Sequence, residues 1–159
     1  MKLNSIGLEK DKATKLATEL NELLANFQVY YQNLRGIHWN IKGKRFFDLH
    51  VKFEEFYDDA NMKVDEIAER ILTLGQIPLH TFKDYSTLAK VPVGKNISED
   101  EKAVRLIVDS ISELLNIERA ILDSSDEAND EGTNSMMSGF ITEQEKTVWM
   151  MKAWLNETI

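Results

Sequence analysis

The sequence contains no cysteine and only three histidines among its 159 residues. Without cysteine the chain can form no disulfide, no thiolate metal site and no cysteine nucleophile. Any metal that the protein binds must therefore be held by histidine nitrogens and carboxylate oxygens.

Long uncharged hydrophobic runs are also absent. No window reaches the roughly 18 apolar residues of a membrane span, and the opening residues, MKLNSIGLEKDK, lack the apolar centre of a secretory signal. We therefore expect no membrane association and a cytoplasmic location. The length predicts a single domain over residues 1–159, with a short N-terminal tail over residues 1–10.

Positive charge is scarce relative to negative charge. There are 19 Lys and Arg residues against 27 Asp and Glu residues, which gives a net charge of -8. Such a field attracts cations and repels a polyanion such as DNA. Most of these acids are expected only to keep helix surfaces soluble, so clustered carboxylates alone indicate a site.

Apolar residues recur at steps of three and four along four segments, a pattern typical of helices that pack on one face. The pattern predicts helices over residues 12–35, 46–74, 98–122 and 137–155. Residues 98–101, Ser-Glu-Asp-Glu, have the form of a capping box at the start of the third helix. The polar segment 123–134 breaks the apolar stripe and predicts the end of that helix.

The connection between the second and third helices is long. It has about 22 residues, whereas antiparallel neighbours are usually joined by about two to eight. A helix of nearly 30 residues is roughly 40 Å long, and an extended connection of this size can return the chain to the starting end. The order of short, long and short connections predicts an all-α fold, a ferritin-like four-helix bundle. We expect a short extra helix over residues 84–90 within the long connection.

Two pairs of metal-ligand residue types lie on the second predicted helix. His50 and Glu54 are four residues apart, so both project from one helix face. Asp65 and Glu69 have the same spacing and fall on the same stripe of the helix, within roughly 100°. Along the axis, however, Glu54 and Asp65 are about 16 Å apart, which is too far for one metal ion. One chain therefore cannot supply both pairs of ligands to one metal ion.

Two copies of this helix could complete each other. If they pack antiparallel about a two-fold axis near Ala60, residue 50 lies opposite residue 69, and residue 54 lies opposite residue 65. Ala60 and Asn61 are small enough to allow close approach at the centre. Imidazole and carboxylate ligands fit iron, manganese or zinc without choosing among them. On spacing alone, the alternative that these acids form a solvated helix face and that His50 is structural stays open.

Two longer motifs resemble the signatures of a known family. The first is HWNIKG over residues 38–43, followed by Leu49 and His50. The second is VDEIAER over residues 64–70, followed by Leu74 and Gly75. With both motifs in order and the same helix pattern, nearly the whole chain resembles the Dps family, the DNA-binding proteins from starved cells.

The resemblance implies a hollow dodecamer that oxidises Fe(II), with hydrogen peroxide as the preferred oxidant, and stores Fe(III) oxide as protection against oxidative stress. It also implies sites shared between two chains, with two irons each. Carried over by position, the ferroxidase ligands are His38, His50, Glu54, Asp65 and Glu69. Glu54 departs from the family pattern, in which the shorter Asp is common. Three acids near the ligand stripe are candidates for nucleating mineral, namely Glu55, Asp58 and Asp59.

Other functions compete with this interpretation. A conventional ferritin or bacterioferritin is disfavoured, because no histidine has a glutamate three residues before it. A non-enzymatic DNA-compacting protein is the main alternative, favoured by the family's name and by lysines near the N-terminus. Glu9 and Asp11 interrupt those lysines, so we expect no tight binding of DNA. A helical interaction module without metal is a third alternative.

Overall fold

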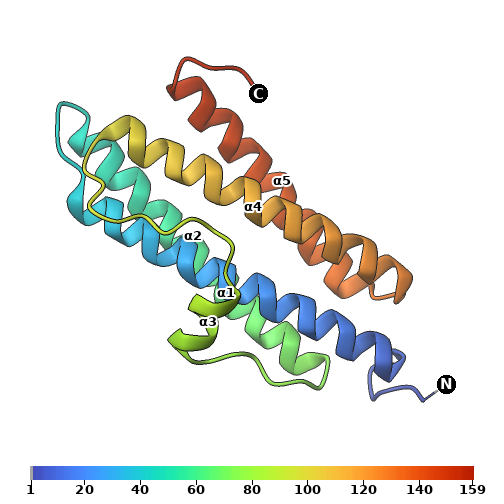
Figure 1. Ribbon diagram of the computed structural model, residues 1–159. Helices are drawn as coiled ribbons and strands as arrows, with labels where there is room; N and C mark the ends of the chain where they lie inside the picture. Colours follow the sequence, from blue (N-terminus) through green and yellow to red (C-terminus); the bar gives the residue numbers. More distant parts are fainter. Residues whose placement is uncertain (1) are drawn as a thin grey trace.

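The computed structural model describes residues 2–159, which form five helices (Figure 1): α1 Lys10–Asn40, α2 Phe46–Thr73, α3 Phe82–Leu88, α4 Asp100–Glu127 and α5 Glu131–Trp154. These residues contain no strand beyond one isolated bridge, and none of their helices is long and apolar enough to span a membrane. α1 packs chiefly against α2, and α4 chiefly against α5 (Figure 1). The predicted all-α, ferritin-like bundle with a short helix in its long connection is confirmed.

α1 is longer than the sequence pattern predicts. It begins at Lys10 and continues through Gly36 to Asn40, whereas the predicted helix covers residues 12–35. A glycine inside a helix costs about 1 kcal/mol relative to alanine. Burial of Leu34 and Ile37 on either side of Gly36 outweighs that cost. His38 therefore lies inside α1, and the prediction that it follows the helix is wrong.

The long connection is held against α1 by asparagine side chains. Asn21, Asn26 and Asn33 bond in turn to backbone groups of segments 77–79, 90–91 and 92–94. These bonds satisfy peptide groups outside any helix, and they explain why the connection follows α1 in Figure 1. Within it, α3 lies at Phe82–Leu88, shifted slightly from the predicted 84–90.

The start of α4 differs from the predicted capping box. Glu99 is the N-cap residue and its side chain makes no cap hydrogen bond, whereas Asp100 accepts the Glu101 amide at 2.8 Å. The Ser98 carbonyl instead accepts the Lys42 amide at 3.0 Å, which ties the returning chain to the end of α1. The predicted box is wrong, although the helix begins at the predicted place.

The turn between α4 and α5 is shorter than predicted because a buried ion pair supports it. Asp130 caps α5 by accepting the Thr133 amide at 3.1 Å, and its carboxylate also accepts Nη2 of Arg70 from α2. Burial opposes ionisation of Asp130, but the hydrogen bonds from Arg70 and Thr133 outweigh it and lower the pKa of Asp130 below its usual value. The break predicted over 123–134 is thus confined to residues 128–130.

A buried acid lies in the core where the four long helices face one another. Glu118 of α4 is 0% exposed and accepts Nε2 of Gln144 from α5 at 2.6 Å. Tyr30 of α1 and Lys63 of α2 lie near it. Burial raises the pKa of Glu118 to about 8, although Gln144 and the charge of Lys63 act in the opposite direction. The carboxyl group is therefore mostly protonated at neutral pH.

This protonation predicts a stability that falls as the pH rises. Below about pH 4.5 the Glu118 carboxyl carries its proton in both the folded and the unfolded chain. Between that pH and about 8 the unfolded chain loses the proton while the folded chain keeps it, so folding is increasingly disfavoured. The substitution Glu118→Gln removes this penalty. We expect it to raise the free energy of unfolding by about 4 kcal/mol at pH 8 and to change it little at pH 4.5.

Thermal unfolding followed by circular dichroism at several pH values measures the difference. Glu145→Gln, which alters an exposed glutamate on α5, controls for the loss of one negative charge. A difference between Glu118→Gln and the unaltered protein that does not change with pH would contradict the prediction.

Candidate metal centre

Two predicted site residues, His38 and His50, meet where α1 ends and α2 begins. Their rings stack with centroids 3.8 Å apart and an interplanar angle of 15°. Nδ1 of His38 lies 2.7 Å from the His50 carbonyl oxygen, and Nδ1 of His50 lies 2.8 Å from the His38 carbonyl oxygen. A carbonyl can only accept, so in the neutral rings both Nδ1 atoms carry the proton. Both Nε2 atoms therefore keep a lone pair for a metal ion.

Aromatic side chains hold the two imidazoles in place. The Phe46 ring stacks on His50 at 4.8 Å, and Tyr57 meets His38 edge-on at 5.2 Å. Glu54 lies beside the Tyr57 hydroxyl. Partial burial, followed by the negative charges of Glu54 and Asp58, raises the pKa of Tyr57 above its ordinary value.

The sequence pattern gave neither Phe46 nor Tyr57 a role in the site. The spacing of Phe46 and Tyr57 along α2 could have identified both residues from the sequence. Phe46 precedes His50 by four residues, and Tyr57 follows Glu54 by three, so both lie beside the ligand stripe.

The predicted carboxylates do not join the histidines within one chain. Glu54, Asp65 and Glu69 are all exposed along α2. Within residues 2–159, no three His, Asp or Glu side chains converge to hold a metal ion. The helical rise of about 16 Å between Glu54 and Asp65 accounts for this. One chain therefore does not bring the predicted ligands together.

Ala60 does not lie where the predicted contact between two copies needs it. It is 0% exposed and packs inside the bundle, so its predicted place at that contact is wrong. Eleven residues make about three helical turns, so the residue that returns to the face of His50 is Asn61. Asn61 is exposed, as that position requires.

Two of the three acids proposed to nucleate mineral are already ion-paired. Glu55 is bound to Lys52, and both oxygens of Asp59 lie within 2.7 Å of Lys63 Nζ. These lysines reduce the negative charge that the two acids offer to a cation. Asp58, the third acid, is exposed.

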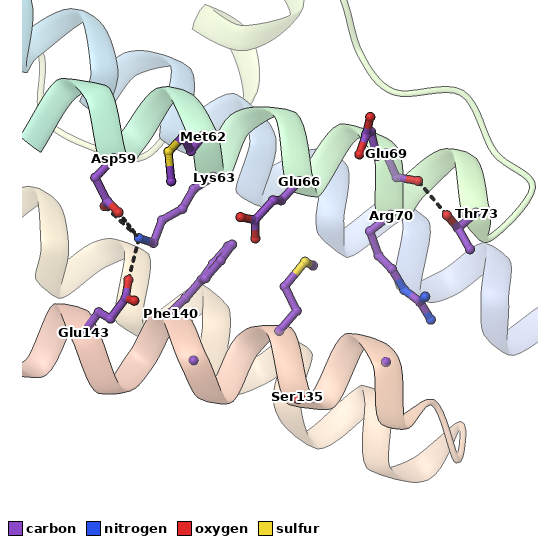
Figure 2. Close-up of a pocket in the computed structure, with 13 residues that line it drawn as sticks. Asp59, Met62, Lys63, Glu66, Glu69, Arg70, Thr73, Ser135, Phe140 and Glu143 are labelled. Carbon is purple, nitrogen blue, oxygen red and sulfur yellow. Dashed lines mark hydrogen bonds and ion pairs between the residues drawn. The ribbon is translucent and has the colours of Figure 1, made fainter.

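A pocket of about 640 Å³ lies between α2 and α5 (Figure 2). Figure 2 shows Lys63 reaching between Asp59 and Glu143 near one end of it. At the other end Arg70 crosses from α2 to α5. A Cβ at position 132 would lie 2.9 Å from the Arg70 guanidinium, so a larger residue in place of Gly132 would displace the Arg70 side chain. Of the predicted ligands, the lining of this pocket includes Glu69 but neither histidine. The pocket is therefore distinct from the histidine pair.

Comparison with known proteins gives consistent matches over nearly the whole chain. The ferritin-like domain family matches residues 17–159. A DNA protection during starvation protein of Porphyromonas gingivalis is 41% identical over 152 residues, which cover 96% of each protein. The crystal structure of a Dps protein from Vibrio cholerae O1, described as a member of a broad superfamily of ferritin-like diiron-carboxylate proteins, matches with a TM-score of 0.95 at 50% identity and covers 98% of both chains. A Dps protein from Bacillus brevis matches with a TM-score of 0.88 at 34% identity, over 91% of this chain and 97% of that one.

The role of Phe46 in orienting the His50 imidazole can be tested by removing the Phe46 ring. Phe46→Ala frees the imidazole to turn, and we expect about tenfold weaker binding of Co(II), in the range typical for residues that orient a ligand. Isothermal titration under anaerobic conditions measures the affinity. Phe47→Ala is the matched control, because Phe47 is 80% exposed and meets Phe46 edge-on rather than either histidine. Equal affinities for the two variants would contradict the role given to Phe46.

Proposed function

This chain belongs to the Dps family of ferritin-like proteins, and we propose that it oxidises Fe(II) to Fe(III) and stores the product as mineral inside a hollow homo-oligomer. Membership of this family supports a role in iron storage and in protection against stress. The proposal that the chain oxidises Fe(II) depends on one observation. His38 and His50 stack on each other, and both of their Nε2 atoms are free to bind a metal ion. Glu54 lies near Tyr57, which meets His38 edge-on.

We place each oxidation site between two chains related by a two-fold axis. His38, His50 and Glu54 come from one chain, and Asp65 and Glu69 from the other. The support is geometric: α2 carries both halves on one stripe, but about 16 Å apart along its axis. An isologous contact between two antiparallel copies of α2 brings unlike halves together and forms two equal sites. The exposed Asn61 lies near the midpoint of the stripe.

Fe(II) is the substrate of this site, and hydrogen peroxide is the proposed oxidant. Two Fe(II) ions each give one electron to one peroxide, which takes up two protons and leaves as two water molecules. A site that holds both ions beside the oxidant delivers the two electrons together, so peroxide is not split by a single electron into hydroxide and hydroxyl radical. The imidazoles orient the ions, and the carboxylates balance their charge.

The proposed assembly is a dodecamer in the cytoplasm with mineral in its cavity. A net charge of -8 per chain favours entry of cations. It also disfavours tight binding of DNA, and the N-terminal residues strengthen that argument. The Lys2 carbonyl accepts the Lys10 amide at 3.0 Å, and Asn4 accepts the amides of Ile6 and Leu8. Lys2 therefore belongs to a folded turn and not to a free basic arm.

Complementation between two inactive variants tests the sharing of each site. One variant carries His38→Ala and His50→Ala, and the other carries Asp65→Ala and Glu69→Ala. We expect each alone to oxidise Fe(II) about 100-fold more slowly, because each site loses two of its five ligands. Co-expression in equal amounts makes half of the dimers mixed, and each mixed dimer has one intact site. Stopped-flow kinetics should then recover about a quarter of the original rate.

Mass spectrometry of intact cages must show mixed assemblies before the rates are compared. A double substitution of the exposed ion pair between Arg119 and Glu145 is the matched control and should keep the full rate. Verified mixed dimers that remain as slow as their parents would show that the two halves do not combine across chains.

A further inference from the structure

Tyr57, on α2, contacts two of the candidate ligands of one chain. Its ring meets the His38 ring edge-on, with the ring centroids 5.2 Å apart. Its hydroxyl is within hydrogen-bonding range of the Glu54 carboxylate, which lies almost one turn earlier on the same helix. Asp58 also places negative charge near this hydroxyl, but Glu54 is the carboxylate that accepts its hydrogen bond. Tyr57 therefore links an imidazole of α1 to a carboxylate of α2.

A row of side chains on α1 supports the Tyr57 ring from the other side. Tyr31 meets Tyr57 edge-on, with the ring centroids 6.2 Å apart. The Arg35 guanidinium lies 5.3 Å from the centre of the Tyr31 ring and 4.8 Å from the centre of the Trp39 ring. These three residues follow one another at intervals of four along α1, so they share one helix face. Attraction between the guanidinium and the two rings fixes Tyr31, which in turn fixes Tyr57.

Glu54 is the candidate ligand that most needs such support. It is exposed, and its side chain has one more rotatable bond than the Asp that is common at this position in the family. A side chain that moves freely loses more conformational entropy when it binds an ion than one that is already held. A hydroxyl that donates to one carboxylate oxygen restricts the side chain and leaves the other oxygen free to bind the ion. Hydrogen bonds of this kind to a ligand strengthen metal binding.

We propose that Tyr57 is a positioning residue, which holds the Glu54 carboxylate in place for a metal ion bound by the histidine pair. Its hydroxyl donates to one oxygen of Glu54, and its ring keeps that carboxylate at a fixed distance from His38. Tyr57 does not itself bind the ion. The inference rests on the proposed function in one respect, since it takes Glu54 and the histidines to be ligands of one site.

The test measures the binding of Co(II) to the assembled protein without oxygen, by isothermal titration and by visible absorption. The signal is the Co(II) binding that His50→Ala removes. Tyr57→Phe takes away the hydroxyl but keeps the ring and its contacts with His38 and Tyr31. We expect about tenfold weaker binding and a changed absorption spectrum, because the ligand geometry changes when Glu54 is no longer held.

Tyr31→Phe is the matched control. It removes the same atom from the neighbouring ring, which packs against Tyr57 but is not a hydrogen-bond donor to Glu54. Its Co(II) affinity and spectrum should equal those of the unaltered protein. A loss in Tyr31→Phe as large as that in Tyr57→Phe would overturn the proposal, because the effect would then come from packing of the rings.

A double-mutant cycle with Glu54→Gln separates positioning from packing in a second way. Without the carboxylate, Tyr57→Phe has nothing to release, so it should weaken Co(II) binding by less than about twofold. An equal loss in both backgrounds would show that Tyr57 acts through His38 alone, and would contradict the proposal. So would unchanged or tighter binding in Tyr57→Phe, since tighter binding would mean that the hydroxyl competes with the ion for Glu54.

Failure of this inference can be told from failure of the proposed function, because Co(II) binding is measured without any oxidation. If Tyr57→Phe binds Co(II) as expected but the unaltered protein does not oxidise Fe(II), the proposed oxidation fails and the positioning role stands. If Fe(II) is oxidised rapidly but Tyr57→Phe binds Co(II) normally, only the positioning role fails. If His50→Ala removes no Co(II) binding, both fail. Circular dichroism and cage size establish that each variant is folded.

Discussion

The length of α2 between its two groups of candidate ligands is the constraint on which the proposed site depends. A helix advances about 1.5 Å with each residue, so ligands at its two ends cannot meet within one chain. At the end near His50, α1 brings His38 against His50, because α1 runs past Gly36 to Asn40. The reciprocal bonds between each Nδ1 and the other histidine's carbonyl then fasten α1 to α2 and fix both rings. The proposed sharing of sites between chains follows from this geometry.

The acidic side chains divide into two groups by how their charge is balanced. Glu54, Asp65 and Glu69 form no ion pair within residues 2–159 and lie exposed on one stripe. Asp59 is neutralised by Lys63, and Asp130 by Arg70. Glu118 is neutralised by a proton, since burial raises its pKa to about 8. The carboxylates on the exposed stripe thus differ from Asp59 and Asp130, which have a cationic partner within residues 2–159.

Much of the fold could be predicted from apolar spacing, because that pattern records which helix faces are buried. The four long helices and the long connection follow from it, whereas the short helix within the connection is predicted from helix propensity alone. The helix ends could not be predicted in the same way. Gly36 and the polar segment 123–134 have weak helix propensity, and tertiary contacts outweigh it, through burial of Ile37 in one case and the Arg70 to Asp130 pair in the other.

The candidate site could likewise be predicted only in part from the sequence. The motifs and spacing identify His38 and His50, which the structure brings together, and they place Glu54, Asp65 and Glu69 on one face of α2. Spacing along one helix does not reveal what another helix places beside it. The edge-on contact of Tyr57 with His38 and the enclosure of Glu118 by Gln144 both join residues from different helices. The prediction that Ala60 lies at the contact between two copies is wrong because it uses the position of Ala60 along the α2 axis. It leaves out the direction in which the side chain projects from that axis.

The most direct test of the central claim is the stoichiometry of oxidation in the unaltered protein. Anaerobic protein loaded with Fe(II) is mixed in a stopped-flow instrument with hydrogen peroxide or with air-saturated buffer, and a spin trap reports hydroxyl radical. The account predicts rapid oxidation by peroxide that consumes about one peroxide for every two Fe(II), slower oxidation by air, and little trapped radical. Oxidation no faster than that of Fe(II) in buffer alone, or one peroxide consumed per Fe(II) with a strong radical signal, would contradict it.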